Sequence, residues 1–365
     1  MRWELSPEQD MFRDSFREWL ADCAAPESVR QWLDSDVSPF EDRLARDGWL
    51  GVGFGEDLGG QGGGLLDLAL AAEQLGSAAA PGGSWLAAVL AVPALAGRPD
   101  LAAAVLERGE YAALAVTAGQ PPDVPGAGDN AVRWADGGLH GTVPAVLAAD
   151  RASRLVVPAW EDGQADGCCT LFLADPSGPA VSLRRRRLLD RTRSAADVTF
   201  AGAPGERLDG DGGEVLATAA LRAAVLVAAD SLGAAGKMLD LAVGYGHQRT
   251  QFGVPIGSFQ AVKHAAATML VSVEASRSIA YFAAASVEQG GGEAPLHAAT
   301  AKAQVTAAAE QASDAALTMH GAIGYTWEHD LQLFYKRAKL NAYLYGTPRV
   351  WNERLASGLP LVPAP

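Results

Sequence analysis

Apolar positions recur at helical spacing from the start of the chain. The segment SPEQ at residues 6–9 offers an N-cap serine, a proline at the first helical position and a glutamine at the third. Met11, Phe12, Phe16 and Leu20 follow with the period of an α-helix. The pattern predicts a capped amphipathic helix that buries one face.

Glycines then interrupt the helical pattern before it returns. The stretch GWLGVGFGEDLGGQGGG begins at Gly48 and lies between helical segments rather than after a strand, so it does not predict a dinucleotide-binding fingerprint. Helices rich in Ala and Leu resume in LLDLALAAEQLG and continue to about Gly97. We therefore predict one α-helical domain over residues 1–112.

The sequence pattern changes at Tyr111, where short apolar runs begin to alternate with Gly, Pro and Asp. Many of these runs are rich in β-branched residues, which strands favour. They predict a small β-barrel or sandwich over residues 113–208. Long helical patterns return beyond it and predict a helical domain over residues 209–365, so the chain is an α+β protein. The β-runs are YAALAVTAG, GLHGTVPAVLA, SRLVVPAW, CCTLFLA, AVSLRRRRLL and AADVTFAG.

The composition agrees with a folded protein of two or three domains, since 49% of the 365 residues are hydrophobic and 20% are charged. The formal net charge of −14 argues against a nucleic-acid surface, because phosphate binding depends on clustered Lys and Arg. The run Arg184–Arg187 is the exception. It indicates either a solvated strand or turn, or a contact for an anionic ligand or partner.

The cysteines and the absence of several known motifs exclude further classes of protein. Cys23, Cys168 and Cys169 do not form a disulfide framework, and the adjacent pair cannot easily bridge or chelate a metal alone. The N-terminal segment lacks signal-peptide features and the apolar stretches are interrupted, so we expect a cytoplasmic protein that spans no membrane. The sequence has no Walker A loop, no C-x-x-C or H-E-x-x-H motif and no G-x-S-x-G elbow, so we expect no metal site.

Two stretches near the C-terminus carry specific patterns: GYGHQRTQFGVPIGSFQAVKH from Gly244, and MHGAIGYTWEHDLQLFYKRAK from Met319. Together they resemble acyl-CoA dehydrogenases, in which R-x-x-F-G-x-P-I-x-x-F-Q and H-G-x-x-G-Y-T recur. Further similar segments, including LSPEQDMFRD and LLDRTRSAADVTF, extend the resemblance to nearly the whole chain. The matching residues are Arg249, Phe252, Gly253, Pro255, Ile256, Phe259, Gln260, His320, Gly321, Gly324, Tyr325 and Thr326.

The resemblance implies a fold and a cofactor. It implies an N-terminal α-helical domain, a middle β-domain, and a C-terminal four-helix bundle that binds FAD and assembles dimers or tetramers. The residue types suit FAD, because Arg249 offers fixed donors to a pyrophosphate and Gly321 and Gly324 permit close backbone approach. Phe252 can pack on an aromatic ring, and Gln260 can hydrogen-bond its polar edges. In the family the Arg-and-Phe element reaches the FAD of a neighbouring subunit.

The reaction that the resemblance implies needs a base that both usual positions lack here. In the family a glutamate takes the α-proton of an acyl thioester; it stands before Gly-Thr, or before an Arg on the first long helix of the C-terminal domain. These positions hold Tyr345 and Leu221, while Arg222 and Thr347 remain as the implied substrate and FAD contacts. A tyrosine with a pKa of about 10 is a poor base at neutral pH. Tyr345 therefore either donates a proton or a hydrogen bond, or fills the space of a small or absent substrate.

The β-domain departs from the family as well. Family members carry a T-E-P-x-x-G-S-D segment that meets flavin and substrate, whereas this chain has VTAGQPPDVPGAGDN. Thr117 is kept, Ala118 replaces the acid, and Asp129 stands about where the serine would contact substrate. An anion there would repel a polyanionic thioester carrier. The flavin-covering W-I-[ST] segment is unrecognisable in HGTVPAVLAAD.

Three functions stay open at this point. The first is a flavoprotein subunit that lacks its own base and pairs with a Glu-bearing homologous chain in the α,β-dehydrogenation of an acyl-CoA or other thioester. Some actinobacterial acyl-CoA dehydrogenases of sterol side chains resemble this arrangement. The second is a stand-alone flavoenzyme in which Tyr345 or a water carries the proton, and the third is a non-enzymatic assembly subunit. The resemblance also implies fatty acid or sterol side-chain metabolism, with electrons passing to an electron-transferring flavoprotein.

Overall fold

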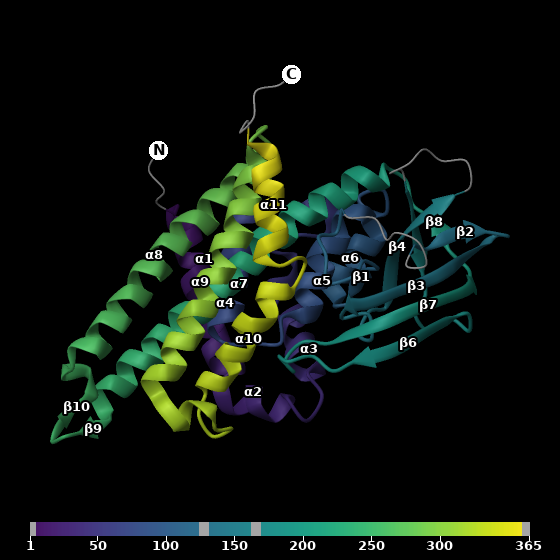
Figure 1. The fold of residues 1–365 in the computed structure, drawn as a ribbon. Helices are drawn as coiled ribbons and strands as arrows, with labels where there is room; N and C mark the ends of the chain where they lie inside the picture. The colour runs from purple at the N-terminus through teal and green to yellow at the C-terminus, as the bar shows by residue number, and fades with distance from the viewer. Residues whose placement is uncertain (1–4, 124–130, 162–168, 360–365) are drawn as a thin grey trace.

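The computed structural model describes residues 5–123, 131–161 and 169–359, and Figure 1 shows how its elements are arranged. Long helices form one side of the molecule, and a twisted β-sheet forms the other. The predicted order of a helical domain, a β-domain and a helical bundle is confirmed.

The N-terminal domain begins with the predicted capped helix. The Ser6 hydroxyl accepts a hydrogen bond from the Gln9 backbone N–H (3.2 Å), and the Gln9 side chain accepts one from the Ser6 N–H (3.0 Å). This reciprocal pair confirms the capping box, and Phe16 and Leu20 form the buried face. The helices are α1 (Pro7–Cys23), α2 (Pro26–Trp32), α3 (Ser38–Arg46), α4 (Leu65–Ser77), α5 (Gly83–Ala91) and α6 (Pro99–Arg108), with 3-10 turns η1 (Trp49–Gly51), η2 (Glu56–Leu58) and η3 (Val92–Leu95).

The middle segment forms a mixed β-sheet in the order β6-β7-β3-β2-β4-β5-β8. Most neighbouring strands are antiparallel, but β1 and β2 each pair with β4 in parallel. The sequence did not predict β2 or β8, because two or three residues are too few to show alternation. The strands are β1 (Ala112–Leu114), β2 (Arg133–Ala135), β3 (Gly138–Leu147), β4 (Arg154–Glu161), β5 (Thr170–Ala174), β6 (Val181–Arg186), β7 (Ala195–Ala203) and β8 (Glu206–Arg207).

The C-terminal domain is the predicted four-helix bundle, with three long helices and a shorter fourth one, and a fifth helix packs against it. α7 packs against the three others and against α4 of the N-terminal domain. It is long and apolar enough to cross a membrane, but 72% of its most apolar window is buried inside the protein, as expected of a core helix. The helices are α7 (Gly212–Gln248), α8 (Gln260–Gln289), α9 (Ala294–His320), α10 (Leu331–Tyr343) and α11 (Pro348–Gly358).

Helices α4 and α7 cross in backbone contact at two glycines. A Cβ on Gly76 would lie 2.0 Å from the carbonyl oxygen of Asp230, and one on Gly233 would lie 1.9 Å from that of Glu73. No side chain fits at either position, because the clashing atoms are backbone. These glycines therefore fix how closely the N-terminal domain docks on the bundle.

A short hairpin joins α7 to α8 at the far end of the bundle (Figure 1). It consists of β9 (Thr250–Gln251) and β10 (Val254–Pro255), followed by the 3-10 turn η5 (Ile256–Ser258). A second 3-10 turn, η6 (Gly321–Tyr325), follows α9. The two family-like motifs lie in these two connections.

Candidate functional site

The Arg-and-Phe motif forms the outermost end of the α7–α8 connection. Phe252 turns the hairpin in the left-handed region, with a φ of 53°, and its side chain is 93% exposed. Its ring meets that of Phe259 edge-on, with centroids 6.1 Å apart. Arg249 and Gln260 are exposed at either end of the same connection. A protruding aromatic ring beside a cation is typical of a surface that contacts another molecule.

The second motif lies at the same end of the bundle. Tyr245, near the end of α7, stacks on His320, the last residue of α9, with ring centroids 4.7 Å apart. Gly321 follows with a φ of 65°, and the space where its Cβ would stand is open. The fold thus brings Arg249 and Gly321, which are far apart in the sequence, to one end of the molecule.

Gly324 serves the internal packing of this turn. A Cβ on Gly324 would lie 3.0 Å from the Cβ of His320 and from a methyl carbon of Leu317. The residue is buried, so it permits η6 to lie close on α9. Sequence reasoning proposed only an approach to the cofactor at this position.

Tyr345 lies in the short turn between α10 and α11 and is 2% exposed. Its backbone has a φ of 56°, in a region that bulky residues rarely adopt. Its N–H donates to the carbonyl oxygen of Ala118 (2.6 Å), and its own carbonyl accepts from the Trp351 indole N–H (2.9 Å). Contacts with both the β-domain and α11 therefore hold the turn in this conformation.

Burial determines the protonation state of Tyr345. Desolvation raises the pKa of its hydroxyl far above the ordinary value, and the nearby cation of Arg193 only partly opposes this. The phenol therefore keeps its proton throughout the neutral range. A group in this state is unsuited to accept a proton from a thioester α-carbon.

Lys302 also stabilises the turn that contains Tyr345. Its ammonium nitrogen is fully buried in α9 and donates to the carbonyl oxygens of Gly346 (2.7 Å) and Asn341 (3.1 Å). Burial lowers the pKa of Lys302 to about 7. Sequence analysis missed this residue. Lys302 lies in an Ala-rich helix, so the sequence pattern does not indicate that its amine is buried.

The β-domain segment around Thr117 packs directly on this turn. The Ala118 N–H donates to the Ala145 carbonyl (3.0 Å), and Thr117 forms an isolated bridge with Val146, so the segment is fixed to β3. A Cβ on Gly346 would lie 3.0 Å from a ring carbon of Pro121. The two segments thus touch where the resemblance would place flavin and substrate.

An ion pair and a helix cap complete this contact. Arg354 of α11 makes a two-pronged ion pair with Asp123, with nitrogen–oxygen distances of 2.8 and 2.7 Å. The Thr347 hydroxyl accepts a hydrogen bond from the Val350 N–H (3.4 Å) and caps α11. Thr347 therefore has a structural role besides the cofactor contact that the resemblance implies.

Arg222 lies on α7 with different surroundings. Its guanidinium carbon is 5.8 Å from the centroid of the Phe54 ring, and its Nη1 is buried without a hydrogen-bond partner among the described residues. Burial lowers its pKa, and the carboxylate of Glu288 partly offsets this. Leu221, beside it, is half-buried. Asp129, the other implied substrate contact, lies outside the described residues, as does Cys168.

A buried ion-pair network lies behind the Tyr345 turn. Asp230 of α7 accepts hydrogen bonds from Arg193 (2.7 Å), Arg337 (3.1 Å) and the Asn341 amide (2.6 Å). Arg337 also pairs with Asp190, which follows β6. The network links the β-domain to the bundle, and it gives Asp190 and Arg193 of LLDRTRSAADVTF a structural role.

Comparison with known proteins agrees with this architecture. Residues 6–108 match the family model of the acyl-CoA dehydrogenase N-terminal domain, and residues 210–359 match that of the C-terminal domain. The acyl-CoA dehydrogenase IpdE2 of Mycobacterium tuberculosis is 31% identical over 357 residues, which cover 96% of each chain. The acyl-CoA dehydrogenase FadE34 of the same organism is 32% identical across 97% of this chain, but across only 48% of its own length.

Solved structures show the same fold. A variant of the Tcur3481–Tcur3483 steroid ACAD superposes with a TM-score of 0.86 at 26% identity, covering 97% of this chain and 98% of the other. The ChsE4–ChsE5 complex from Mycobacterium tuberculosis gives a TM-score of 0.87 at 23% identity over both full chains. Together with the two family models and the relative at 31% identity, these likenesses show that the chain belongs to the acyl-CoA dehydrogenase family.

Proposed function

We propose that this chain is a flavoprotein subunit that supports the α,β-dehydrogenation of an acyl-CoA or other acyl thioester, and that a homologous partner chain supplies the glutamate. Membership of the family supports an oxidoreductase that acts on CH–CH bonds. The observation that carries the finer proposal is the protonated, buried state of Tyr345 at the position where the resemblance places that glutamate.

The outer end of the bundle has the groups that FAD binding requires. Arg249 is an exposed cation with several fixed donors, and Phe252 is an exposed ring able to pack on the cofactor. Gln260 is exposed beside them, and the backbone at Gly321 is open to close approach. These residues would bind and orient FAD, which accepts a hydride when bound. Because Arg249, Phe252 and Gln260 are exposed to solvent, we propose that they complete the FAD site of the partner subunit.

Among the described residues, the chain's own β-domain and its Tyr345 turn are in direct contact. The Ala118 carbonyl accepts the Tyr345 N–H, and Pro121 packs against Gly346, so the β-domain meets the C-terminal turn directly. The β-domain lacks the family's acid at Ala118. We therefore propose that the reaction takes place in the partner's cleft.

The substrate and electron acceptor follow from the relatives. The likeness to a structure described as a steroid ACAD supports a steroid-derived acyl thioester as the substrate of the assembly. The likeness to the ChsE4–ChsE5 complex is consistent with two different chains in one assembly. We propose an electron-transferring flavoprotein as the acceptor, as the family resemblance implies.

The decisive experiment is the ratio of flavin to chain in natively purified protein. Absorbance gives the flavin content, and mass spectrometry identifies any co-purifying chain. We expect one FAD for every two chains, in complex with a homologue that carries the glutamate. One FAD per chain in an active homomer would establish the stand-alone enzyme instead, whereas a complete lack of FAD would favour a pure assembly role.

A further inference from the structure

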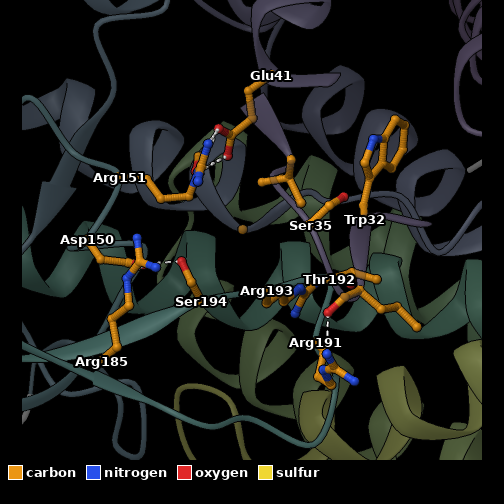
Figure 2. Close-up of a pocket in the computed structure, with 14 residues that line it drawn as sticks. Trp32, Ser35, Glu41, Asp150, Arg151, Arg185, Arg191, Thr192, Arg193 and Ser194 are labelled. Carbon is orange, nitrogen blue, oxygen red and sulfur yellow. Dashed lines mark hydrogen bonds and ion pairs between the residues drawn. The ribbon is translucent and has the colours of Figure 1, made fainter. Parts of the chain in front are cut away.

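A cavity of about 130 Å³ opens between the N-terminal domain and the β-sheet (Figure 2). Its walls come from the α2–α3 connection, the start of α5, the β3–β4 turn and the segment around β6 and β7. Four arginines line it: Arg151, Arg185, Arg191 and Arg193. In a chain with a net charge of −14, such a concentration of guanidinium groups is unexpected.

The run Arg184–Arg187 contributes one member to this cavity because of strand alternation. Arg184 and Arg186 both pair with Asp197, at 3.0 and 2.7 Å from their Nε atoms. Arg185, between them on β6, turns the other way and pairs through its Nε with Asp150 (3.0 Å). Arg184, Arg185 and Arg186 end the exposed strand β6, as one sequence-based interpretation predicted, and Arg185 is the member of the run that lines the cavity.

The arginines at the rim keep donors available for a ligand. Arg185 uses its Nε for Asp150, and its guanidinium has no partner besides Asp150 among the described residues. Arg191 uses Nη2 for the Leu33 carbonyl (2.5 Å) and for Asp34. Its Nε and Nη1 have no hydrogen-bond partner among the described residues. The side chains of Arg185 and Arg191 are 73% and 38% exposed, so they can reorient toward an incoming group.

The inner wall of the cavity contributes hydrogen-bond donors that are held more rigidly than those of Arg185 and Arg191. Gly83 and Ser84 begin α5, whose N-terminus has no side-chain cap, so backbone N–H groups with a favourable dipole face this side. Arg193 is buried, and its two Nη groups donate to Asn341 and Asp230, so only its Nε lacks a hydrogen-bond partner among the residues that the structure describes. An unpartnered buried donor has a free-energy cost that an acceptor at this place would relieve.

The carboxylates of the cavity are already occupied. Both oxygens of Glu41 accept from the Nε of Arg151, at 2.9 and 2.7 Å. Asp150 accepts from the Ser194 hydroxyl (2.7 Å) and pairs with Arg185. These acids therefore hold the guanidinium groups in place around the cavity.

We propose that this cavity binds a small oxyanion of the size of phosphate, either free phosphate or the phosphate of a monoester. Guanidinium groups match the geometry of phosphate oxygens, and the uncapped start of α5 adds a second kind of anion donor. The cavity is large enough for one such group. The site is independent of the flavin contacts at Arg249 and Phe252.

The test is isothermal titration of the purified full chain, together with any partner that co-purifies, at constant ionic strength set with chloride. The probes are inorganic phosphate and glycerol phosphate. We expect saturable binding that weakens roughly tenfold in Arg185→Gln and in Arg191→Gln, since each loses charged hydrogen bonds. Arg184→Gln is the matched control, because it lies next to Arg185 on β6 but pairs with Asp197 on β7.

Each outcome decides the proposal. Binding of both probes with this variant pattern supports free phosphate as a sufficient ligand, and binding of the monoester alone with the same pattern supports an ester. Lack of saturable binding by either probe overturns the proposal. So does unchanged affinity in Arg185→Gln and Arg191→Gln, or a loss seen instead in Arg249→Gln, which would place the anion at the outer end of the bundle.

Discussion

Tyr345 has the position of a base in the sequence but the surroundings of a core residue. Its phenol is buried and keeps its proton, since desolvation raises its pKa. We predict that Tyr345→Phe leaves the turnover of the purified assembly within about twofold of wild type, because no transition-state contact is removed. Steady-state kinetics at matched flavin content measures this. A fall of roughly a hundredfold, the range of general acid–base catalysis, would make the hydroxyl a proton carrier.

A second prediction at the residue scale concerns Lys302. Lys302→Met leaves the buried carbonyls of Gly346 and Asn341 without their donor, and we expect the free energy of unfolding to fall by roughly 2–4 kcal/mol at pH 8. Urea unfolding measures the loss. Lys263→Met, at an exposed position of α8, should change the stability little.

The same variant gives a pH test. The pKa of Lys302 is lowered to about 7 in the fold from an ordinary value of 10.5, so the unfolded chain binds more protons between these values. The contribution of Lys302 to stability must therefore rise with pH in this window, by at most about 1.4 kcal/mol per pH unit. The deficit of Lys302→Met relative to wild type should grow from pH 7 to pH 9. A constant deficit would show that the amine does not titrate there.

At the scale of elements, the ion pair between Asp123 and Arg354 ties the β-domain segment to α11. Both side chains are 30% exposed, so we expect Arg354→Met to cost only about 0.5–1 kcal/mol of global stability. Local opening should become easier, and the Tyr345 amide, which donates to Ala118, should exchange its hydrogen faster. Hydrogen-exchange mass spectrometry measures this. Arg349→Met, exposed on the same helix, is the control that should leave the exchange unchanged.

The α7–α8 connection gives the other prediction at this scale. Phe252 is 93% exposed, so Phe252→Ala should leave the unfolding free energy of the chain within about 0.5 kcal/mol of wild type. The flavin content of the purified assembly should nevertheless fall, because the ring packs on the cofactor in our proposal. Met11→Ala removes another exposed apolar side chain, 66% exposed on α1, and should not change the flavin content. Full flavin retention in Phe252→Ala would argue against a role for the hairpin.

These elements also show what the sequence can predict. The capping box between Ser6 and Gln9 is local, so the sequence alone predicted it. The motif residues Arg249 and Phe252 could be named in advance, but not the hairpin of two-residue strands that carries Phe252. Pairs such as Asp123 with Arg354 join positions far apart in the chain, and no periodicity indicates which side chains meet. The fold class therefore followed from patterning, whereas the contacts between the β-domain and the Tyr345 turn required the structure.

At the scale of the whole molecule, Arg337 joins all three domains. It pairs with Asp190 next to the sheet and with Asp230 in the bundle, and it donates to the Ala80 carbonyl of the N-terminal domain (2.7 Å). Its side chain is fully buried, so Arg337→Met leaves two buried carboxylates short of a partner and should cost roughly 3–5 kcal/mol. We expect calorimetry to show one unfolding transition in wild type and separate transitions in Arg337→Met, because the domains lose their coupling. Arg17→Met, 58% exposed on α1, is the matched control.

The stability of the molecule in acid depends on the same contacts of Arg337. Burial alone would raise the pKa of Asp190, but the cations of Arg337 and Arg193 outweigh it and hold the pKa below its ordinary value of 3.8. The stabilisation is therefore present above pH 3.8 and is lost as the pH falls through the lower, folded value. In Arg337→Met the opposing cation is removed and burial raises the pKa of Asp190, so acid unfolding should begin at a higher pH than in wild type. Circular dichroism followed from pH 7 to pH 2 checks this, and coincident acid transitions in the two proteins would mean that Asp190 does not depend on Arg337 for its charge.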